Sequence, residues 1–333
     1  MIEFIDLNGA KLFHPITHFS IINIETLPVC VFFYNRSDLA LQCLNAVSRS
    51  SDGLKVDLYI FIDGPRNNID KNQIKEVVYI IDNFDFSVFN DVVIKKNSIN
   101  YGLSSSIING VSKVVREYGY VLVIEDDLIV SRNFMHFMKE SLEKYQYNKK
   151  IGSVSGFSFA LRPLDNYDVY FHPRPTSWGW GTWYDRWNQV NWMVDPKYLE
   201  EINYSKKKFN ELGQDMHRML KGYLSNRVDS WAIRWALYHW KSKWIAITPY
   251  KSKVVNNGFG NNLATNTKVT NEFLIKFDES NNIGPFSFPE TLIVEKRNKR
   301  IVNFYNGNFL RFLQKYSPKF IWDLFCKNIF RFF

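Results

Sequence analysis

The chain has 333 residues, of which 46% are hydrophobic and 17% aromatic. It can therefore bury a substantial core, which excludes global disorder. Its formal net charge of +9 favours an anionic partner such as a nucleotide or an anionic lipid. The basic residues are spread along the chain and form none of the standard nucleic-acid-binding modules, so no nucleic acid is expected as a partner.

The cysteines and the first residues of the chain indicate in which cellular compartment the protein resides. Cys30, Cys43 and Cys326 lack the spacing of metal ligands and indicate reduced thiols. The first residues lack the basic and then apolar pattern of a secretory signal, and no apolar run is long enough to span a bilayer. We therefore expect a cytoplasmic protein.

Expected strands alternate with expected helices through the first half of the chain. Strands are predicted at 28–34, 56–63, 91–95 and 120–124, and helices at 38–48, 71–82, 103–117 and 134–145. This alternation predicts an α/β fold with a parallel, doubly wound sheet. Right-handed crossovers would bring the carboxyl ends of these strands to one edge.

Three acids follow the fourth expected strand. The segment YVLVIEDD ends its apolar run in Glu125, Asp126 and Asp127, at the edge where open α/β sheets bind ligands. Clustered carboxylates repel one another unless a cation neutralises them, and a divalent metal that bridges a diphosphate does so well. The alternative is a solvated turn with one acid capping the next helix.

Other polar residues also follow strands in this part of the chain. Asn35 and Arg36 come after the first strand, and Asp63 and Gly64 after the second. Each pair alone is typical of an ordinary turn or surface position. Their shared edge with the acids makes them candidates for the same site.

The second half of the chain is rich in tryptophan and then in charge. Five tryptophans lie between positions 178 and 192, and the glycine-interrupted phrase SWGWGTW predicts a loop. Their rings could form a platform for sugars or bases, or an ordinary aromatic core. Helices are expected within 197–224 and from Asp229 to about Trp240, and a polar loop over 256–267.

The last segment, 308–333, has a character of its own. It holds five basic residues and one acid, and its aromatic residues fall at helical spacing. A basic, aromatic, amphipathic terminus is typical of a helix that lies in a membrane interface. The alternative is a terminal helix that packs on the catalytic domain or on a dimer partner.

Several motifs together resemble GT-A glycosyltransferases. The closer resemblance is to the bacterial surface-polysaccharide transferases described as family 2-like, which are distantly similar to N-acetylglucosaminyltransferase I. The matching stretch covers about residues 28–267, with these motifs: FFYNR (32–36), FIDG (61–64), NYGLSSSIINGV (100–111), VIEDDLIVSRNFMHF (124–137), RPTSWGWGTWYDRW (174–187), VDSWAIRW (228–235) and NNGFGNNLATNT (256–267).

The resemblance implies a Rossmann-like GT-A fold with acceptor-side helices and a C-terminal amphipathic tail. Together with the character of the last segment, it predicts four parts: an N-terminal extension (1–27), a nucleotide-sugar-binding half (28–150), an acceptor-binding half of the same domain (151–307), and the basic helical tail (308–333).

The resemblance also implies a role for each candidate residue. Tyr34, Arg36 and Asp63 would contact the nucleotide base or ribose, and Glu125 and Asp126 would hold sugar or ribose hydroxyls. Asp127 would ligate Mn²⁺ or Mg²⁺. The remaining candidates would form the acceptor side: Asp229 as general base, and Trp178, Trp180, Trp183 and Asn266 around the sugar and acceptor pocket.

Two of these roles have alternatives. Asp229 stands in the pattern Asp-Ser-Trp and could simply cap its helix. Similar sequences often carry His where Asn266 stands, and Asn is the poorer ligand for Mn²⁺. Either Asp127 and the diphosphate hold the metal, or the fold is retained with weak activity.

The expected function is an inverting, metal-dependent glycosyltransferase that moves a sugar from a nucleotide sugar, a UDP-sugar, to a lipid-linked oligosaccharide. The resemblance implies lipopolysaccharide, O-antigen or capsule synthesis, and the basic aromatic tail predicts peripheral contact at the inner face of the cell membrane. One alternative is a sugar nucleotidyltransferase, although FFYNRSDLA lacks the glycine-rich basic loop of such enzymes. Another is a catalytically weak GT-A scaffold that binds sugar or membrane.

Overall fold

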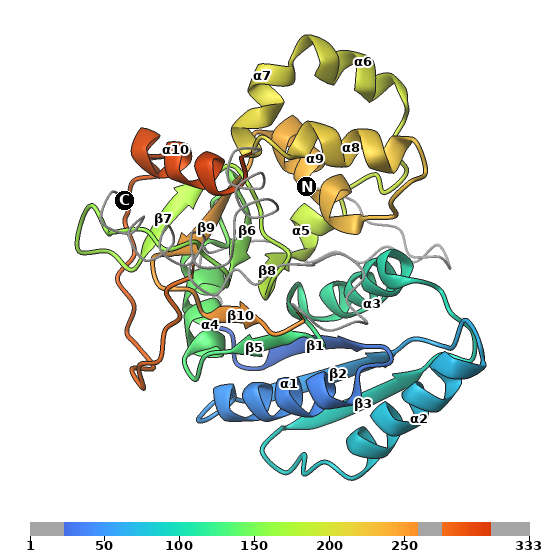
Figure 1. The fold of residues 1–333 in the computed structure, drawn as a ribbon. Coiled ribbons are helices and arrows are strands. Elements are labelled where there is room, and N and C mark those ends of the chain that lie inside the picture. The colour runs from blue at the N-terminus through green and yellow to red at the C-terminus, as the bar shows by residue number, and fades with distance from the viewer. Residues whose placement is uncertain (1–22, 259–274, 308–333) are drawn as a thin grey trace, which may run out of the picture.

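The structure, a computed structural model, describes residues 23–258 and 275–307 (Figure 1). Its centre is an eight-stranded sheet of order β3-β2-β1-β4-β8-β6-β9-β7. The strands are β1 (Leu27–Phe33), β2 (Val56–Ile62), β3 (Asp91–Lys96), β4 (Tyr120–Glu125), β6 (Ile151–Ser155), β7 (Val169–His172), β8 (Trp180–Trp183) and β9 (Ile245–Pro249).

The direction of the strands changes across the sheet. The first four in this order are parallel, β8 runs against both β4 and β6, and β7 runs against β9. The sheet is thus mostly parallel but mixed, and it has helices on both faces. This confirms the predicted fold class, because the arrangement is consistent with a GT-A, Rossmann-like fold.

Alternate residues of β1 face two different cores. Val29 and Val31 pack with helices α1 (Ser37–Ser50), α2 (Asn68–Asp82) and α4 (Phe134–Tyr145). Cys30 and Phe32 pack on the opposite face with α3 (Leu103–Tyr118) and α9 (Trp231–Ser242). Because successive strand residues point to opposite faces, a near-continuous apolar strand fits a sheet covered on both sides.

The smaller elements lie around this sheet. Helices α6 (Lys197–Tyr204), α7 (Lys206–Phe209) and α8 (Met216–Leu224) gather with α9 at the top of Figure 1, away from β1–β3. The others are α5 (Tyr184–Trp187), α10 (Lys296–Tyr305) and a two-stranded sheet of β5 (Leu128–Val130) and β10 (Val254–Asn256). None of the helices within 23–258 and 275–307 is both long enough and apolar enough to cross a membrane.

The phrase SWGWGTW corrects one expectation, since its second half is strand β8 and not a loop. Trp180 pairs with Val123 in the middle of the sheet and is fully buried. A Cβ on Gly181 would come within 2.8 Å of Leu122 Cδ2 and 3.0 Å of Val121 O. The glycine therefore permits close packing on β4 rather than breaking the element.

The aromatic cluster around Trp180 gives a stability prediction. The Trp180 ring centroid lies 5.4 Å from that of Trp187 and 5.0 Å from that of Trp231. Trp180→Ala should lower the free energy of unfolding by about 3–5 kcal/mol, because it opens a cavity in this cluster. Denaturant melts would measure this, with Met193→Ala, at a position 83% exposed, as a control expected within about 0.5 kcal/mol of wild type. Equal stabilities of the two variants would contradict the prediction.

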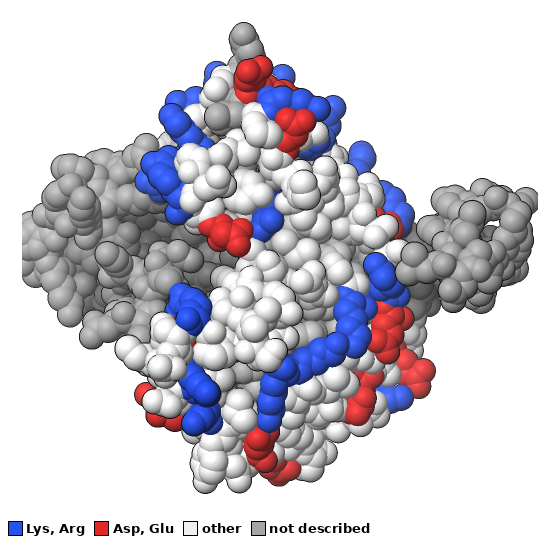
Figure 2. Space-filling model, turned by 90° about the vertical axis from the view of Figure 1, so that its right-hand side faces the viewer, with Lys and Arg blue, Asp and Glu red and all other residues white. Residues whose placement is uncertain are grey.

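Positive charge collects on one side of the surface. Figure 2, which views the right-hand side of Figure 1, shows a diagonal run of adjoining Lys and Arg side chains that passes from the right toward the lower middle of that face, with Asp and Glu side chains beside it. Lys95 of β3 and Lys113 of α3 lie close together, and the neighbouring ammonium group, with burial, lowers the pKa of Lys95. Some of the basic side chains on this face are therefore close neighbours.

Candidate functional site

The direction in which successive strands join the sheet reverses between β1 and β4. From β1 the chain continues to β2 and β3 on one side, and it returns with β4 on the other side of β1. Phe32 of β1 lies opposite Glu125 of β4, so the residues that follow the two strands emerge next to each other. Open α/β sheets bind ligands at such a switch point, outside the carboxyl ends of the strands.

Arg36 and two aspartates meet at this switch point. Arg36 Nε donates to Asp126 Oδ2 at 3.4 Å, and Arg36 Nη2 donates to Asp126 Oδ1. Arg36 Nη1 donates to Asp127 Oδ2 at 3.2 Å. The side chains are 17% exposed for Arg36, 6% for Asp126 and 16% for Asp127. One guanidinium thus neutralises part of the charge of two carboxylates.

Burial changes the acidity of two acids in this cluster, Glu125 and Asp126. Burial raises the pKa of Asp126 to about 6, although the Arg36 guanidinium opposes the shift. Burial also raises the pKa of Glu125 well above its usual value, and the carboxylates of Asp127 and Asp126 add to that rise. The cluster therefore favours a bound cation or a hydroxyl-rich ligand that can satisfy these carboxyl groups.

A hydrogen-bonded network fixes Tyr34 beside the cluster. The Tyr34 hydroxyl donates to Asp70 Oδ2 at 2.6 Å, and Arg66 Nε donates to the same hydroxyl at 2.9 Å. The guanidinium of Arg66 also lies 5.0 Å from the centroid of the Tyr34 ring. Asn35 Nδ2 donates to Asp70 Oδ1 at 3.1 Å. Sequence reasoning missed Asp70 and Arg66, since nothing local to the loop and start of α2 marks them.

The Asp63 carboxylate is hydrogen-bonded to other groups of the protein. Its carboxylate accepts hydrogen bonds from the backbone N–H groups of Gly64, Tyr101 and Gly102 and from the side-chain amides of Asn97 and Asn100. The buried carboxylate thus joins the turn after β2 to the loop before α3. Its contact with a nucleotide stays a prediction, and its structural role is the organisation of this loop.

The strand β10 brings a late part of the chain against Asp127. Asn257 N donates to Asp127 O at 2.8 Å, and Gly258 N donates to Asn256 Oδ1 at 2.7 Å. A Cβ on Gly258 would lie 2.7 Å from Asp127 Oδ2. The missing side chain therefore keeps space beside this carboxylate, which the sequence did not reveal because the two residues are far apart in the chain.

The carboxylate oxygens of this cluster are of a type that binds Mn²⁺ or Mg²⁺, and the lack of a side chain at Gly258 leaves room for such an ion beside Asp127. Carboxylate oxygens are ligands of hard divalent cations. Among the described residues, no group of three or more His, Cys, Asp and Glu side chains is arranged to hold a metal ion. Asp127 is thus a fitting single attachment point, and further ligands would come from the bound substrate or from residues outside the described part.

The tryptophans predicted to line a pocket divide into two groups. Trp180 is fully buried, and Trp183, 4% exposed, donates from Nε1 to Leu142 O at 3.2 Å. The aromatic-core alternative describes these two, so their assignment to the pocket surface is corrected. Trp178 is half-buried, with its ring centroid 4.6 Å from that of Phe157. It alone of the three keeps the pocket prediction.

Asp229 lies just before α9, and Ser230 is the residue that caps this helix. Ser230 Oγ accepts from Ile233 N at 3.4 Å, so the capping alternative for Asp229 is wrong. The Asp229 side chain is 63% exposed and accepts from Arg234 Nη2 at 3.0 Å. Trp231 stacks on Trp180, which pairs with Val123 near the carboxyl end of β4. This packing places the start of α9 against the part of β8 that pairs with the second half of β4.

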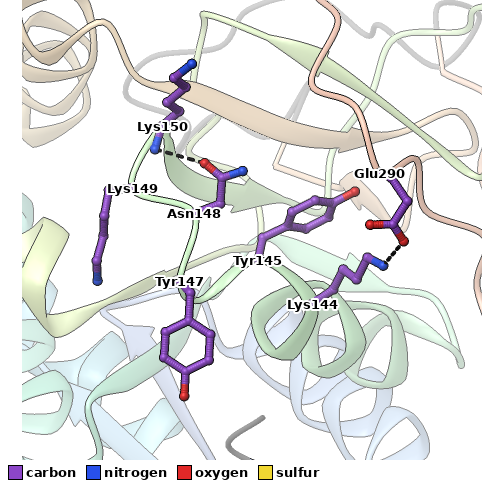
Figure 3. A pocket seen from close by; sticks show the side chains of 7 residues that line it. All are labelled: Lys144, Tyr145, Tyr147, Asn148, Lys149, Lys150 and Glu290. Carbon is purple, nitrogen blue, oxygen red and sulfur yellow. Dashed lines mark hydrogen bonds and ion pairs between the residues drawn. The ribbon is translucent and has the colours of Figure 1, made fainter. Parts of the chain in front are cut away.

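Asn266 and the tail 308–333 lie outside the described residues. An open surface pocket of about 620 Å³, lined by Lys144, Tyr145, Tyr147, Asn148, Lys149, Lys150 and Glu290, lies at the amino end of β6 (Figure 3). That end belongs to the opposite edge of the sheet from the acids, and Lys144 and Lys149 are ion-paired with Glu290 and Asp185. We do not place the chemistry there.

Comparison with known proteins gives distant structural likenesses. No family model matches the chain, and no curated protein matches it. It is similar to a mannosyltransferase, PcManGT from Pyrobaculum calidifontis, in complex with GDP-Man and Mn²⁺, with a TM-score of 0.34, 10% identity, and coverage of 50% of this chain and 46% of that one. It is also similar to S. aureus TarS 1–349, with a TM-score of 0.41, 10% identity, and coverage of 70% and 60%. The chain thus covers less than two thirds of either structure.

Proposed function

We propose that the protein is a glycosyltransferase that uses a nucleotide sugar. The observation that carries this proposal is the placement of Glu125, Asp126 and Asp127, together with Arg36, at the switch point between β1 and β4. A partly buried group of acids at that edge suits a ligand with hydroxyls and a metal-bound diphosphate. The resemblance of the sequence motifs to GT-A enzymes supports the same conclusion.

The residues divide by function within this proposal. Tyr34, held by Asp70 and Arg66, presents its ring to the nucleotide, and Glu125 and Asp126 accept hydrogen bonds from hydroxyls. Asp127 would hold Mn²⁺ or Mg²⁺, which supplies positive charge to the departing diphosphate when it is bound. This division leaves acceptor activation to a group on another element.

Asp229 is the proposed general base. Its exposed carboxylate before α9 can accept the proton of an acceptor hydroxyl on the side of the sugar opposite the diphosphate. That geometry gives a single displacement with inversion. Trp178 would lie at the sugar side of the same pocket.

For the donor we propose a UDP-sugar, and for the acceptor a lipid-linked oligosaccharide of lipopolysaccharide, O-antigen or capsule synthesis. The motif resemblance supports both. A location on the inner face of the cell membrane is supported by the basic aromatic tail.

A thermal-shift panel tests the proposed function. UDP-, GDP-, CMP- and dTDP-sugars would be added with and without Mn²⁺, since a ligand that binds only the folded state raises its apparent stability. We expect a shift with a UDP-sugar that grows with Mn²⁺, and slow Mn²⁺-dependent donor hydrolysis. Absence of a shift with every donor would overturn the proposal. Binding without any hydrolysis or transfer would favour a catalytically weak scaffold.

The tail gives a separate prediction about the membrane. Deletion of 308–333, with its excess of basic over acidic residues, should move the protein from anionic vesicles to the soluble fraction in a sedimentation assay. Binding of the full chain should weaken with added salt, because salt screens charges at the surface. Continued sedimentation of the truncated chain, or no sedimentation of the full chain, would contradict the prediction.

A further inference from the structure

Arg36 holds the two aspartates unequally. It faces Asp126 with two nitrogens, Nε and Nη2, in the forked geometry of a strong guanidinium–carboxylate pair. It reaches Asp127 with one nitrogen, Nη1, at 3.2 Å. Asp126 is also the more buried of the two aspartates. The contact with Asp126 is therefore the fixed one, and the contact with Asp127 is the one that can be exchanged.

The position of Arg36 favours this arrangement. Arg36 stands at the turn between β1 and α1, as the residue before the first turn of α1, and Asp126 and Asp127 follow β4, the neighbour of β1. The pairing of the two strands thus sets the distance between the guanidinium and the acids. A metal ion held by Asp127 would therefore meet the positive charge of Arg36, which also contacts this carboxylate.

We propose that Arg36 acts as a resident counter-cation that makes metal binding at Asp127 depend on the diphosphate of the nucleotide. This inference rests on the proposed function and names Arg36 as a positioning residue for it. Without nucleotide, Arg36 partly neutralises Asp127 and repels a divalent cation. With nucleotide, the negative diphosphate compensates the repulsion, so that the metal and the nucleotide bind together.

Linkage gives this inference a measurable form. If UDP raises the affinity for Mn²⁺ by some factor, then Mn²⁺ raises the affinity for UDP by the same factor. Arg36 should account for much of that factor, because its Nη1 contact with Asp127 competes with the metal only while no diphosphate is present to accept that hydrogen bond instead. Removal of its charge should therefore strengthen the binding of bare Mn²⁺ and reduce the coupling between the two ligands.

The experiment is a titration of the full-length protein with Mn²⁺, followed through the electron paramagnetic resonance signal of free Mn²⁺, with and without UDP. Arg36→Gln should bind Mn²⁺ alone on the order of tenfold more tightly than wild type, as expected for the loss of one like charge in a partly buried site. Arg36→Lys keeps the charge and should stay near wild type. Arg132→Gln, which removes a guanidinium from an exposed pair with Asp52, is the matched control.

Several results would overturn the inference. They are an unchanged Mn²⁺ affinity in Arg36→Gln, a gain in Arg36→Lys equal to that in Arg36→Gln, and a gain that persists when Asp127→Asn is added. The wild-type protein gives a test that needs no variant, because equal Mn²⁺ affinity with and without UDP also overturns the inference. If no nucleotide binds to the wild type, the proposed function fails as well. If UDP and Mn²⁺ strengthen each other's binding in the wild type, and Arg36→Gln has the Mn²⁺ affinity of the wild type, only this inference is overturned and the proposed function stands.

Discussion

Asp127→Ala is expected to reduce metal-dependent sugar transfer by at least about 10²-fold, because a metal at a departing diphosphate supplies several kcal/mol of stabilisation in the transition state. The same change should weaken the binding of UDP in the presence of Mn²⁺. The fold should persist, since Arg36 keeps its two contacts with Asp126. Transfer assays with and without Mn²⁺, combined with thermal melts, would measure both effects.

Asp52→Ala is the matched control for this prediction. Asp52 is also an aspartate paired with an arginine, Arg132, but the pair is exposed and its worth to stability is about 0–1 kcal/mol. Transfer by this variant should stay at the wild-type level. Mn²⁺-dependent transfer that survives in Asp127→Ala would show that the metal, if one is used, is held elsewhere.

The first half of the fold could be predicted because its signals are local. Helix α4 spans Phe134–Tyr145, the range that the sequence predicts, and the four parallel strands agree with their expected ranges to within two residues. Mostly apolar strands that alternate with amphipathic helices leave few alternatives to a doubly wound sheet. The meeting of Arg36 with the acids at one edge follows from that topology.

The second half was harder to predict because its signals are tertiary. Trp180 and Gly181 form a strand only because β4 and β6 lie on either side of β8. In an isolated sequence, the glycines around them indicate a loop. The expected helical region 197–224 is likewise divided near Gly213, whose φ of +148° lies outside the helical range.

The same reason explains which site residues were missed. Asp70 fixes Tyr34 across 36 positions of the chain, and Gly258 lies against Asp127 across a still longer separation. Neither contact leaves a periodic or compositional mark. At α9 the sequence suggested Asp229 as the capping residue, and the geometry shows that the adjacent Ser230 accepts the hydrogen bond instead.

The assignment of the cap to Ser230 sharpens the test of Asp229 as general base. Asp229→Asn keeps the shape of the side chain but loses its basicity at neutral pH. Transfer should fall by about 10²–10⁴-fold, the usual worth of general base catalysis. UDP affinity should not change, since the base acts on the acceptor. The melting temperature should barely move, because the Asp229 side chain is 63% exposed and the amide oxygen of Asn can still accept a hydrogen bond from Arg234.

Ser230→Ala is the control that separates catalysis from helix capping. It removes the side-chain oxygen that accepts from Ile233 N, which should cost about 1 kcal/mol of stability, and it should leave most of the transfer activity. Asp229→Asn should thus lower transfer and leave the melting temperature nearly unchanged. Ser230→Ala should lower the melting temperature and leave most of the transfer activity. If Asp229→Asn transfers sugar at nearly the wild-type rate, the base lies elsewhere. Asp215, which accepts from Arg174 at 2.7 Å, would be tested next. Asp185 is a weaker candidate, because it pairs with Lys149 at the opposite edge of the sheet.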